Sequence, residues 1–372
     1  MSRRAAWAAA LALAAALLGG CAAERPKPTP LETYAPKASA HLVWSQRLGK
    51  LDFPLEPAAG VGQVIVAASA GTVIALALDN GAELWRASAG AALSAGVGSD
   101  GRFASVVTRR NEVVTFEQGR EVWRKRVPSS VVTPPFVAGE RVFVMGVDRV
   151  VHAFDALDGR RLWTLQRAGD ALTLALPGVL AAYHDTLLVG QGPQLVGVDP
   201  LRGSVRWSVP LASPRGTNEV ERLADLVGPP ARHGERICAR AFQSAVGCAD
   251  AARASVLWTR NTGGVQPVAV DAERVYGADA VDRITAWRAD NGDVAWSSER
   301  MLNRGLSGPL AVGAFVVFGD SEGYLHFLAA ASGEPQLRLA TDGSPVLGAP
   351  QLAGRTMLVV TRAGGVFALR QN

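Results

Sequence analysis

A tryptophan recurs about every forty residues along this chain. Tryptophans stand at positions 44, 85, 123, 163, 207, 258 and 296, and Leu337 continues the series. The successive steps are 41, 38, 40, 44, 51, 38 and 41 residues. A nearly fixed period of this length indicates a repeat architecture, in which each unit buries its apolar face against the next unit.

Each repeat contains short β patterns separated by turn residues. Glycine stands four residues before most marker positions, at Gly81, Gly119, Gly159, Gly203, Gly292 and Gly333. A proline marks the expected start of the first strand, where it need not donate a ladder hydrogen bond, at Pro134, Pro177, Pro229, Pro267, Pro309 and Pro350. Runs rich in β-branched and aromatic residues, such as 141–144 and 150–154, lie between them. We therefore expect four short antiparallel strands per repeat.

Repeated four-stranded units of this length predict an all-β fold, a β-propeller. Residues 42–372 number 331, which gives eight blades of about 41 residues each. The chain ends in a β run without its tryptophan strand, at 364–370, and begins with a tryptophan strand alone, at 41–44. We expect these two ends to complete one blade. The ring of the eight-bladed propeller, residues 41–372, would then close between the N- and C-terminal strands.

The N-terminus has the pattern of a secretion signal. Arg3 and Arg4 precede the uncharged stretch 5–20, which is shorter than the roughly 20 residues of a transmembrane helix but fits a signal peptide. The stretch ends in Leu18-Gly19-Gly20-Cys21, which resembles a bacterial lipobox. This resemblance implies that residues 1–20 are a lipoprotein signal peptide and that Cys21 becomes lipidated. An ordinary secretory signal with a coincidental cysteine is the alternative.

Residues 21–40 are expected to form a lipidated cysteine followed by a proline-rich tether. Prolines stand at 26, 28, 30 and 36, a composition typical of extended, poorly packing linkers. Ala22, not aspartate, follows the cysteine. By the sorting rule of the lipoproteins that this signal resembles, we expect the outer membrane, with the propeller on its periplasmic face.

Composition and motifs argue against several functions. The net charge is +5, too small an excess for a nucleic-acid binder with a clustered basic face. The five histidines are scattered without metal-ligand spacing, and no hydrolase, metalloprotease or phosphate-loop motif is present. We therefore name no catalytic residue and no metal site. Cys238 and Cys248 are expected on adjacent strands, where a disulfide and two packed free thiols remain equally open.

The segment Ala153-Phe154-Asp155 to Gly159 and Trp163 resembles the repeat of PQQ-type propellers. This resemblance implies that the tryptophans pack between blades as core residues. Quinoprotein dehydrogenases with such repeats hold PQQ between a tryptophan and an adjacent cysteine pair, with Ca²⁺ and an aspartate base. Here Cys238 and Cys248 are ten residues apart, and the chain has no oxygen-ligand cluster for calcium. We expect no cofactor and no enzyme.

Two consecutive repeats carry the longest loops. The distance from Trp163 to His184 is 21 residues and from Trp207 to Gly234 is 27, against about 13–18 elsewhere. The first insertion contains leucines at 172, 174 and 176, and the second contains the charged stretch 216–225. Loops on adjacent blades would form one patch, and apolar anchors beside a polar rim are typical of protein interfaces. The alternative is that the leucines fold back under their loop.

Two stretches resemble a specific family. Residues 319–327, GDSEGYLHF, and residues 218–225, NEVERLAD, are similar to motifs of the BamB family, lipoproteins of the outer-membrane β-barrel assembly (BAM) machinery. The lipobox, the eight repeats and the chain length also fit, so the resemblance covers essentially the whole mature chain. It implies a non-catalytic propeller that binds the POTRA domains of BamA and aids the insertion of β-barrel proteins.

The resemblance also implies which residues meet the partner. Leu172, Leu174 and Asp225 match the contact residues of the family, and we add their neighbours Glu221, Arg222 and Leu223. Ala175 stands where the family usually has arginine, and Val227 where it has a second aspartate. We therefore expect docking through apolar contacts, or through charges that neighbouring residues, Glu221 and Arg222, supply instead.

We expect further partners to be the other BAM lipoproteins, nascent outer-membrane proteins and, through the anchor, the membrane. The alternative functions are a periplasmic propeller that binds a ligand or polysaccharide, and a PQQ-dependent dehydrogenase. A ligand-binding propeller would place polar and aromatic groups around its central channel.

Overall fold

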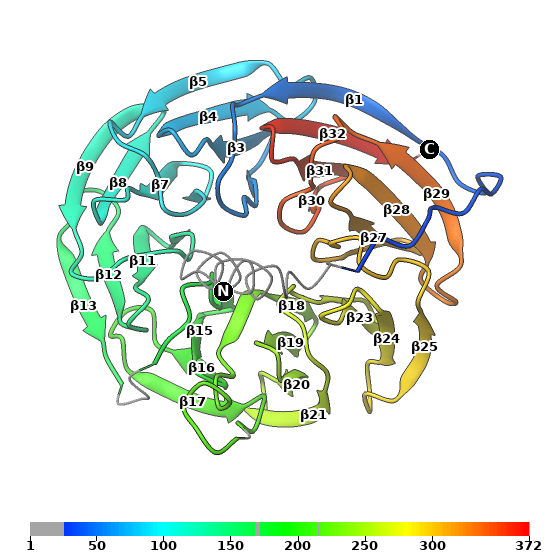
Figure 1. Ribbon diagram of the computed structural model, residues 1–372. Helices are drawn as coiled ribbons and strands as arrows, with labels where there is room; N and C mark the ends of the chain where they lie inside the picture. The colour runs from blue at the N-terminus through cyan, green and yellow to red at the C-terminus, as the bar shows by residue number, and fades with distance from the viewer. Residues whose placement is uncertain (1–25, 168–171, 215, 372) are drawn as a thin grey trace, which may run out of the picture.

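The computed structural model describes residues 26–167, 172–214 and 216–371. These residues form strands, turns and loops, and the strands make eight four-stranded sheets arranged as a closed ring (Figure 1). The predicted all-β, eight-bladed propeller is confirmed. No helix in this part of the chain is long and apolar enough to cross a membrane.

The first four blades follow one another in chain order, and the strands of each blade are given from the innermost to the outermost. Blade 1 contains β2 (Ala58–Ala59), β3 (Gln63–Ala67), β4 (Thr72–Ala77) and β5 (Glu83–Ser88). Blade 2 contains β6 (Gly98–Ser99), β7 (Phe103–Val107), β8 (Glu112–Glu117) and β9 (Arg120–Arg126). Blade 3 contains β10 (Phe136–Ala138), β11 (Arg141–Met145), β12 (Val151–Asp155) and β13 (Arg161–Leu165). Blade 4 contains β14 (Leu180–Tyr183), β15 (Thr186–Gln191), β16 (Gln194–Val198) and β17 (Val205–Pro210).

The remaining blades complete the ring. Blade 5 contains β18 (Leu226–His233), β19 (Arg236–Ala241), β20 (Ala245–Asp250) and β21 (Ser255–Asn261). Blade 6 contains β22 (Ala269–Val270), β23 (Arg274–Ala278), β24 (Ile284–Arg288) and β25 (Val294–Ser298). Blade 7 contains β26 (Leu310–Val312), β27 (Phe315–Gly319), β28 (Tyr324–Ala329) and β29 (Pro335–Ala340). Blade 8 contains β30 (Gln351–Ala353), β31 (Thr356–Val360), β32 (Gly365–Gln371) and, from the other end of the chain, β1 (Ala40–Arg47).

The ring closes in blade 8. Strand β1 pairs antiparallel with β32 from Ala40 opposite Gln371 to Arg47 opposite Gly365. The first strand of the propeller thus supplies the outer strand of the last blade, as the unmatched sequence ends predict. This pairing covers the edge of β32, which would otherwise be open for pairing with another chain.

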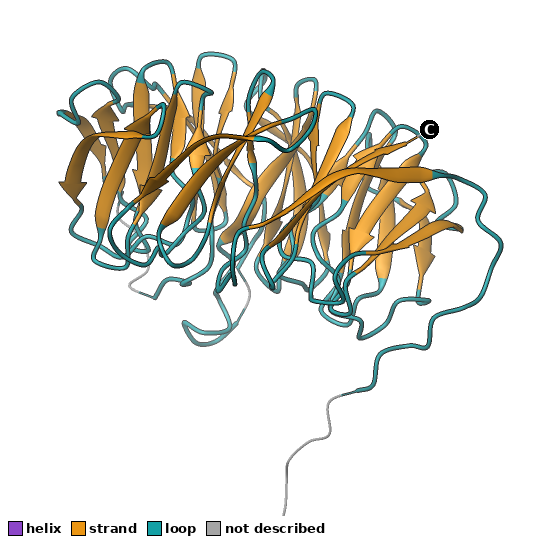
Figure 2. Cartoon of the chain, turned by 90° about the horizontal axis from the view of Figure 1, so that it is seen from above, coloured by secondary structure: helices purple, strands orange, loops and turns teal. Residues whose placement is uncertain are grey.

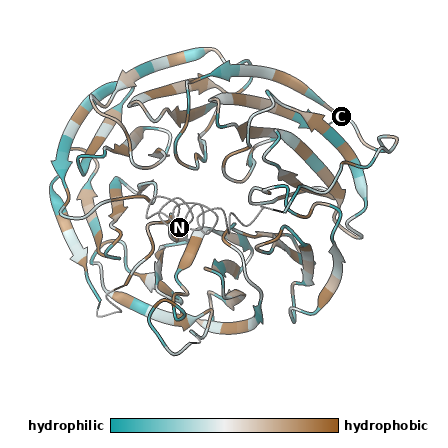
Figure 3. Cartoon of the chain, in the orientation of Figure 1, coloured by the Kyte–Doolittle hydropathy of each residue, from teal (hydrophilic) through white to brown (hydrophobic). Residues whose placement is uncertain are grey.

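Burial divides each blade into inner and outer strands. All five residues of β7 are buried, whereas β9 of the same blade buries only Trp123. Figure 3 shows the same contrast, with apolar colour concentrated in the inner strands and polar colour frequent along the outer ones. The core therefore lies between neighbouring blades, and their outer strands face solvent.

The recurring tryptophans join one blade to the next. The indole of Trp123 donates a hydrogen bond from Nε1 to the carbonyl oxygen of Ala156 at 2.8 Å, and Trp258 does the same to Ala289 at 3.0 Å. The ring of Trp123 lies against Gly159, which has φ +70°, and a Cβ there would approach the ring to 2.6 Å. Glycine is thus required both for the turn and for the close approach. The inter-blade position predicted for the tryptophans is confirmed.

The prolines mark the first strands with one exception. Pro134, Pro177 and Pro267 precede β10, β14 and β22. Pro229 instead lies inside β18, where the register with β19 shifts between Val227 and Ala231. The irregular stretch accommodates a residue that has no N–H to donate.

The N-terminal segment is held against blade 7 more closely than the expected loose tether. We call residues 26–39 the strap. The amide of Thr29 donates to the carbonyl oxygen of Leu302 at 2.9 Å, and the amide of Lys37 donates to that of Gln336 at 2.8 Å. The strap thus passes from the connection between blades 6 and 7 to the outer strand β29 of blade 7 before β1 begins (Figure 1 and Figure 2). The proline-rich composition correctly indicates extended chain, but not its contacts.

Candidate functional site

The two long insertions lie on one end of the ring, which we call the loop face. Strands alternate in direction within each blade, so the connections between blades and the turns between second and third strands share this end. The first insertion loop, residues 166–179, joins β13 to β14, and the second, residues 211–225, joins β17 to β18. They follow consecutive blades and therefore emerge beside each other.

Backbone contacts tie the first insertion loop to the start of β18, directly after the second loop. Gly178 and Val227 form an isolated antiparallel bridge. The amide of Gly228 also donates to the carbonyl oxygen of Pro177 at 2.7 Å. The first loop therefore lies against the strand that the second loop leads into, as the order of the insertions in the sequence predicts.

Asp225, the last residue of the second loop, joins it to the first. One oxygen, Oδ1, accepts a hydrogen bond from Arg149 Nη2 at 2.5 Å, and Oδ2 accepts the backbone N–H of Leu174 at 3.2 Å. Arg149 also donates to the carbonyl oxygen of Leu172 at 3.3 Å. The side chains of Asp225 and Arg149 are only 14% and 17% exposed. Asp225 therefore lies beneath the leucine-bearing loop and holds it in place.

Arg149 was not singled out by the sequence reasoning. It lies in the turn between β11 and β12 and has φ +62°, a conformation that non-glycine residues adopt rarely. The only sequence signal is a long basic side chain at a turn position usually held by glycine or asparagine. Its partner, 76 positions along the chain, becomes its neighbour only through the ring.

The leucines differ in how far they reach the surface. Leu172 and Leu174 are half-buried, as is Leu223 of the second loop. Leu176 is 38% exposed and Val220 is 69% exposed. The last two were not among the expected contact residues, although both stand within the insertions. The patch is therefore a set of apolar side chains, partly buried and partly exposed, that spans both loops.

The charged residues Glu221 and Arg222 of the second loop are both exposed, but their contacts differ. Glu221 is exposed, and its carboxylate accepts the backbone N–H of Thr217 at 2.8 Å, which lowers the pKa of Glu221. Arg222 is exposed. Of the two departures from the family pattern, Ala175 is exposed, whereas Val227 is 3% exposed within β18. A charge at position 227 of this chain would be buried in the blade.

Two further expectations concern cysteines. Cys21 lies outside the described residues. Cys238 and Cys248 occupy directly opposed positions on β19 and β20 and form a disulfide, with their Cα atoms 4.1 Å apart. Both are fully buried. This bond joins neighbouring strands of one blade and lies away from the surface.

The stretch 319–327 builds a buried charged cluster in blade 7. Asp320 Oδ2 accepts hydrogen bonds from Arg304 Nε at 2.9 Å and from His326 Nε2 at 2.9 Å, with His326 in the tautomer that donates there. Arg304 in turn donates from Nη1 to the carbonyl oxygen of Thr29 at 2.9 Å. The stretch therefore supports the strap, and it lies on a different blade from the insertion loops.

A cavity of about 220 Å³ opens in the central channel, at the inner ends of blades 1 to 5. Its lining contains six prolines together with Val97, Phe136, Leu180 and Glu56. No tryptophan and no cysteine contributes to it. These residues do not fit PQQ, which in the dehydrogenases needs an aromatic floor and a cysteine pair, so we assign no chemistry through that cofactor. Within the described residues, no three His, Cys, Asp or Glu side chains gather as a metal site.

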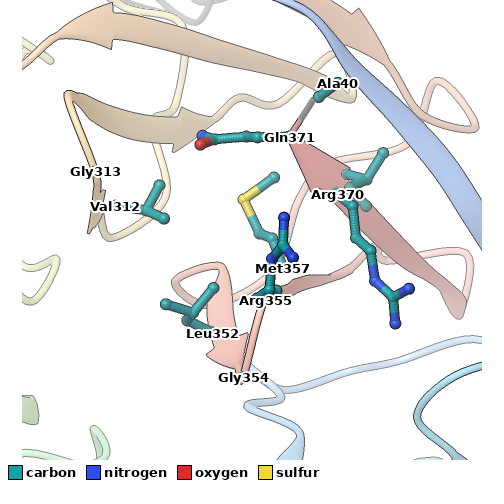
Figure 4. A pocket seen from close by; sticks show the side chains of 10 residues that line it. Ala40, Val312, Gly313, Leu352, Gly354, Arg355, Met357, Arg370 and Gln371 are labelled. Atoms are coloured by element: carbon teal, nitrogen blue, oxygen red, sulfur yellow. The ribbon is translucent and has the colours of Figure 1, made fainter.

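Another cavity, of about 330 Å³, lies at the opposite end of the ring between blades 7 and 8. Figure 4 shows Val312, Leu352 and Met357 around it, with Arg355, Arg370 and Gln371 from the same blade 8 strands and turn. It is remote from the insertion loops, because the turns after first strands and the end of β32 lie away from the loop face.

Comparisons with known proteins agree on one family. A family model described as "Outer membrane protein assembly factor BamB" matches residues 69–298. A protein of that name from Bordetella pertussis is 33% identical over 99% of this chain and 98% of its own length. The one from Burkholderia pseudomallei is 34% identical over 98% of each chain, and that from Escherichia coli is 26% identical over 96% and 97%.

Solved structures show the same fold. The crystal structure of BamB from Moraxella catarrhalis superposes with a TM-score of 0.81 at 20% identity, over 89% of this chain and all of that one. A quinohemoprotein alcohol dehydrogenase from Comamonas testosteroni matches with a TM-score of 0.69 at 16% identity, over 89% and 76%. At these identities the likeness concerns the fold alone.

Proposed function

Because the chain belongs to the BamB family, whose curated relatives are named outer membrane protein assembly factors, we propose that it is a scaffold in the assembly of outer-membrane β-barrel proteins. It acts without catalysis: the closed ring holds a docking surface in fixed geometry. Its partner there is the row of POTRA domains of BamA, and the other BAM lipoproteins complete the complex. Nascent barrel proteins pass near the same surface.

The observation that carries this proposal is the apolar patch on the two insertion loops. Leu174 and Leu176 are on the first loop, and Val220 and Leu223 are on the second, which also carries the charged Glu221 and Arg222. The Asp225 carboxylate joins the two loops at the Leu174 amide. An apolar centre with a polar rim is the anatomy of a protein interface. The buried pair of Asp225 and Arg149 holds the first loop, so less ordering entropy is lost when a partner docks.

The location follows from the N-terminal signal. Signal peptide 1–20 is removed, Cys21 carries the lipid, and the propeller works on the periplasmic face of the outer membrane. More than one acyl chain gives an anchor that stays in the bilayer. The strap then joins this anchor to blade 7.

The test is binding to the purified periplasmic domain of BamA after substitution of the patch. Leu174→Asp puts a charge at a half-buried apolar position, and Val220→Asp puts one at an exposed apolar position. Each is expected to weaken binding at least tenfold, since central apolar anchors carry most of the energy of an interface. Isothermal titration calorimetry with the mature lipoprotein in detergent measures the change.

Leu352→Asp is the matched control, because Leu352 is 44% exposed near the opposite end of the ring. It should leave the affinity unchanged. The melting temperature of Val220→Asp should also match that of the wild type, which separates lost docking from lost folding. Unchanged affinity in both loop variants would place the docking surface elsewhere.

A further inference from the structure

Glu56 is the one charged residue that lines the cavity in the central channel. It lies in the connection between β1 and β2, just before the first strand of blade 1. The rest of the lining is uncharged: the polar Ser99 and Thr133, three glycine or alanine positions, the apolar residues Val97, Phe136, Val137 and Leu180, and the prolines 54, 57, 134, 135, 177 and 229. A carboxylate thus faces an apolar, proline-lined space.

No counter-charge accompanies this carboxylate in the described part of the chain. Neither an ion pair nor a hydrogen bond joins the Glu56 side chain to another described residue, although the chain makes ion pairs at many other acidic positions. Burial raises the pKa of Glu56 to about 7. Leaving a charge in apolar surroundings is costly unless it is paired, so a positive group brought next to this carboxylate would stabilise its ionised form.

The cavity adjoins the docking patch. Gly178, which bridges the first insertion loop to Val227 of β18, lines this cavity and also the small one of about 30 Å³ that Leu174 lines. Pro177 at the end of the first insertion loop lines the channel as well. A protein seated on the insertion loops would therefore lie next to the mouth of the channel.

We propose that the channel mouth receives one basic side chain, lysine or arginine, of the protein that docks on the insertion loops, and that Glu56 pairs with its charged head. This inference rests on the proposed function. The long apolar stem of either side chain suits the proline and valine lining, while its head suits the carboxylate. A divalent cation suits the site poorly, because one carboxylate supplies few of the oxygen ligands that Ca²⁺ needs.

The first arm of the test needs no partner protein. With ¹³C-labelled glutamate, the Glu56 carboxyl is assigned by comparison with Glu56→Gln and titrated by NMR. Excess N-acetyl-lysine methylamide is expected to lower the pKa of Glu56, since an ammonium group favours the ionised carboxylate. The norleucine analogue, which keeps the stem and lacks the charge, should leave it unchanged. If the lysine derivative leaves it unchanged too, the proposal is overturned.

The second arm uses the periplasmic domain of BamA. At pH 8, where Glu56 is ionised, Glu56→Gln should weaken binding about tenfold, as expected for loss of a charged hydrogen bond. The wild-type affinity should fall between pH 8 and pH 6, because Glu56 takes up a proton across that range, and the affinity of Glu56→Gln should change less. No other lining residue of the channel titrates in this range.

Glu140→Gln is the matched control, since Glu140 lies in the turn between β10 and β11 at the far end of the ring. It should bind as the wild type does. Equal affinity of wild type and Glu56→Gln would overturn the channel site and leave the scaffold proposal intact. Absence of wild-type binding would instead contradict the scaffold proposal, and the lysine titration would still decide the channel site.

Discussion

At the scale of single residues, a cluster of buried charges stabilises blade 7. Asp320 is fully buried, and Arg304 is 2% exposed. Burial alone would raise the pKa of Asp320, but hydrogen bonds from His326, the Tyr324 amide and Arg304 outweigh it and keep the pKa below the ordinary value. The cluster is thus stable as an ion pair with its remaining oxygen positions satisfied, which a buried pair requires.

Asp320→Asn should strongly destabilise the protein. The substitution removes the anion beneath a buried guanidinium, and breaking a buried pair in this way costs about 3–5 kcal/mol. Denaturant titration measures the loss. Because the folded state lowers the pKa of Asp320, this part of the wild-type stability is present at neutral pH and declines as the pH falls below about 4.

Glu322→Gln provides the comparison within the same cluster. Glu322 also pairs with Arg304, but its side chain is 50% exposed. An exposed ion pair contributes about 1 kcal/mol or less, so this variant should stay close to the wild type. Equal losses in the two variants would show that burial does not distinguish the two carboxylates.

At the scale of elements, the strap and the insertion loops are irregular segments held by specific partners. Glu32 holds the strap through both its side chain and its backbone. Its carboxylate pairs with Arg300 at 3.0 Å, and its carbonyl oxygen accepts a hydrogen bond from Arg338 at 2.8 Å. Arg338 also lies over the ring of Tyr34 at 5.2 Å. Such contacts order an extended segment without any secondary structure of its own.

The double substitution Thr29→Pro with Glu32→Ala should release the strap while the blades stay folded. It removes the N–H that Leu302 accepts and the ion pair with Arg300, so the amides of residues 31–38 should exchange with solvent roughly tenfold faster, as expected for about 1 kcal/mol lost at each contact. Hydrogen exchange with mass spectrometry measures this.

Lys27→Ala serves as the control for the strap, and its exchange should equal that of the wild type. The melting temperature of the double variant should remain within about 2 °C, because the strap lies outside the blade cores. Rapid exchange of these amides already in the wild type would contradict the docked strap.

At the scale of the whole molecule, the ring depends on its two ends meeting in blade 8. Strand β1 buries Trp44 against the next blade, where its indole donates to the carbonyl oxygen of Leu78 at 2.8 Å. Gly81 has φ +71°, and a Cβ there would approach the Trp44 ring to 2.7 Å. The N-terminal strand therefore joins blade 8 to blade 1 as well as completing blade 8.

Deletion of residues 40–47 should open the ring. The variant would expose the edge of β32, which can pair with another chain, and would lose the Trp44 contacts. We expect oligomers in light scattering after size exclusion, and a melting temperature lower by more than 10 °C, in line with a loss of several kcal/mol. Deletion of residues 22–39 removes a longer segment but keeps β1, so it should remain monomeric. Monomeric behaviour of both deletions would contradict closure as the stabilising feature.

Periodicity was sufficient to predict the fold and the position of the two long loops after adjacent blades. The spacing of the tryptophans predicts the length of a blade, and the number of intervals predicts the number of blades in the ring. The two longest intervals locate the insertion loops that follow adjacent blades. These inferences succeed because each contact of a repeat recurs at a constant separation along the chain. The roles of single residues in the patch were less accessible: Asp225 lies under the loop, and Leu176 and Val220 reach the surface.

Patterns within about forty residues, together with the matching chain ends, are enough to predict the four-stranded repeat, the number of repeats, the closure of the ring and the family. The contact of Arg149 with Asp225, the hydrogen bond from Arg304 to Thr29 and the position of Glu56 in an apolar channel become visible only in the folded ring. These groups come together through the curvature of the ring, which juxtaposes residues from different blades at separations that no local pattern records.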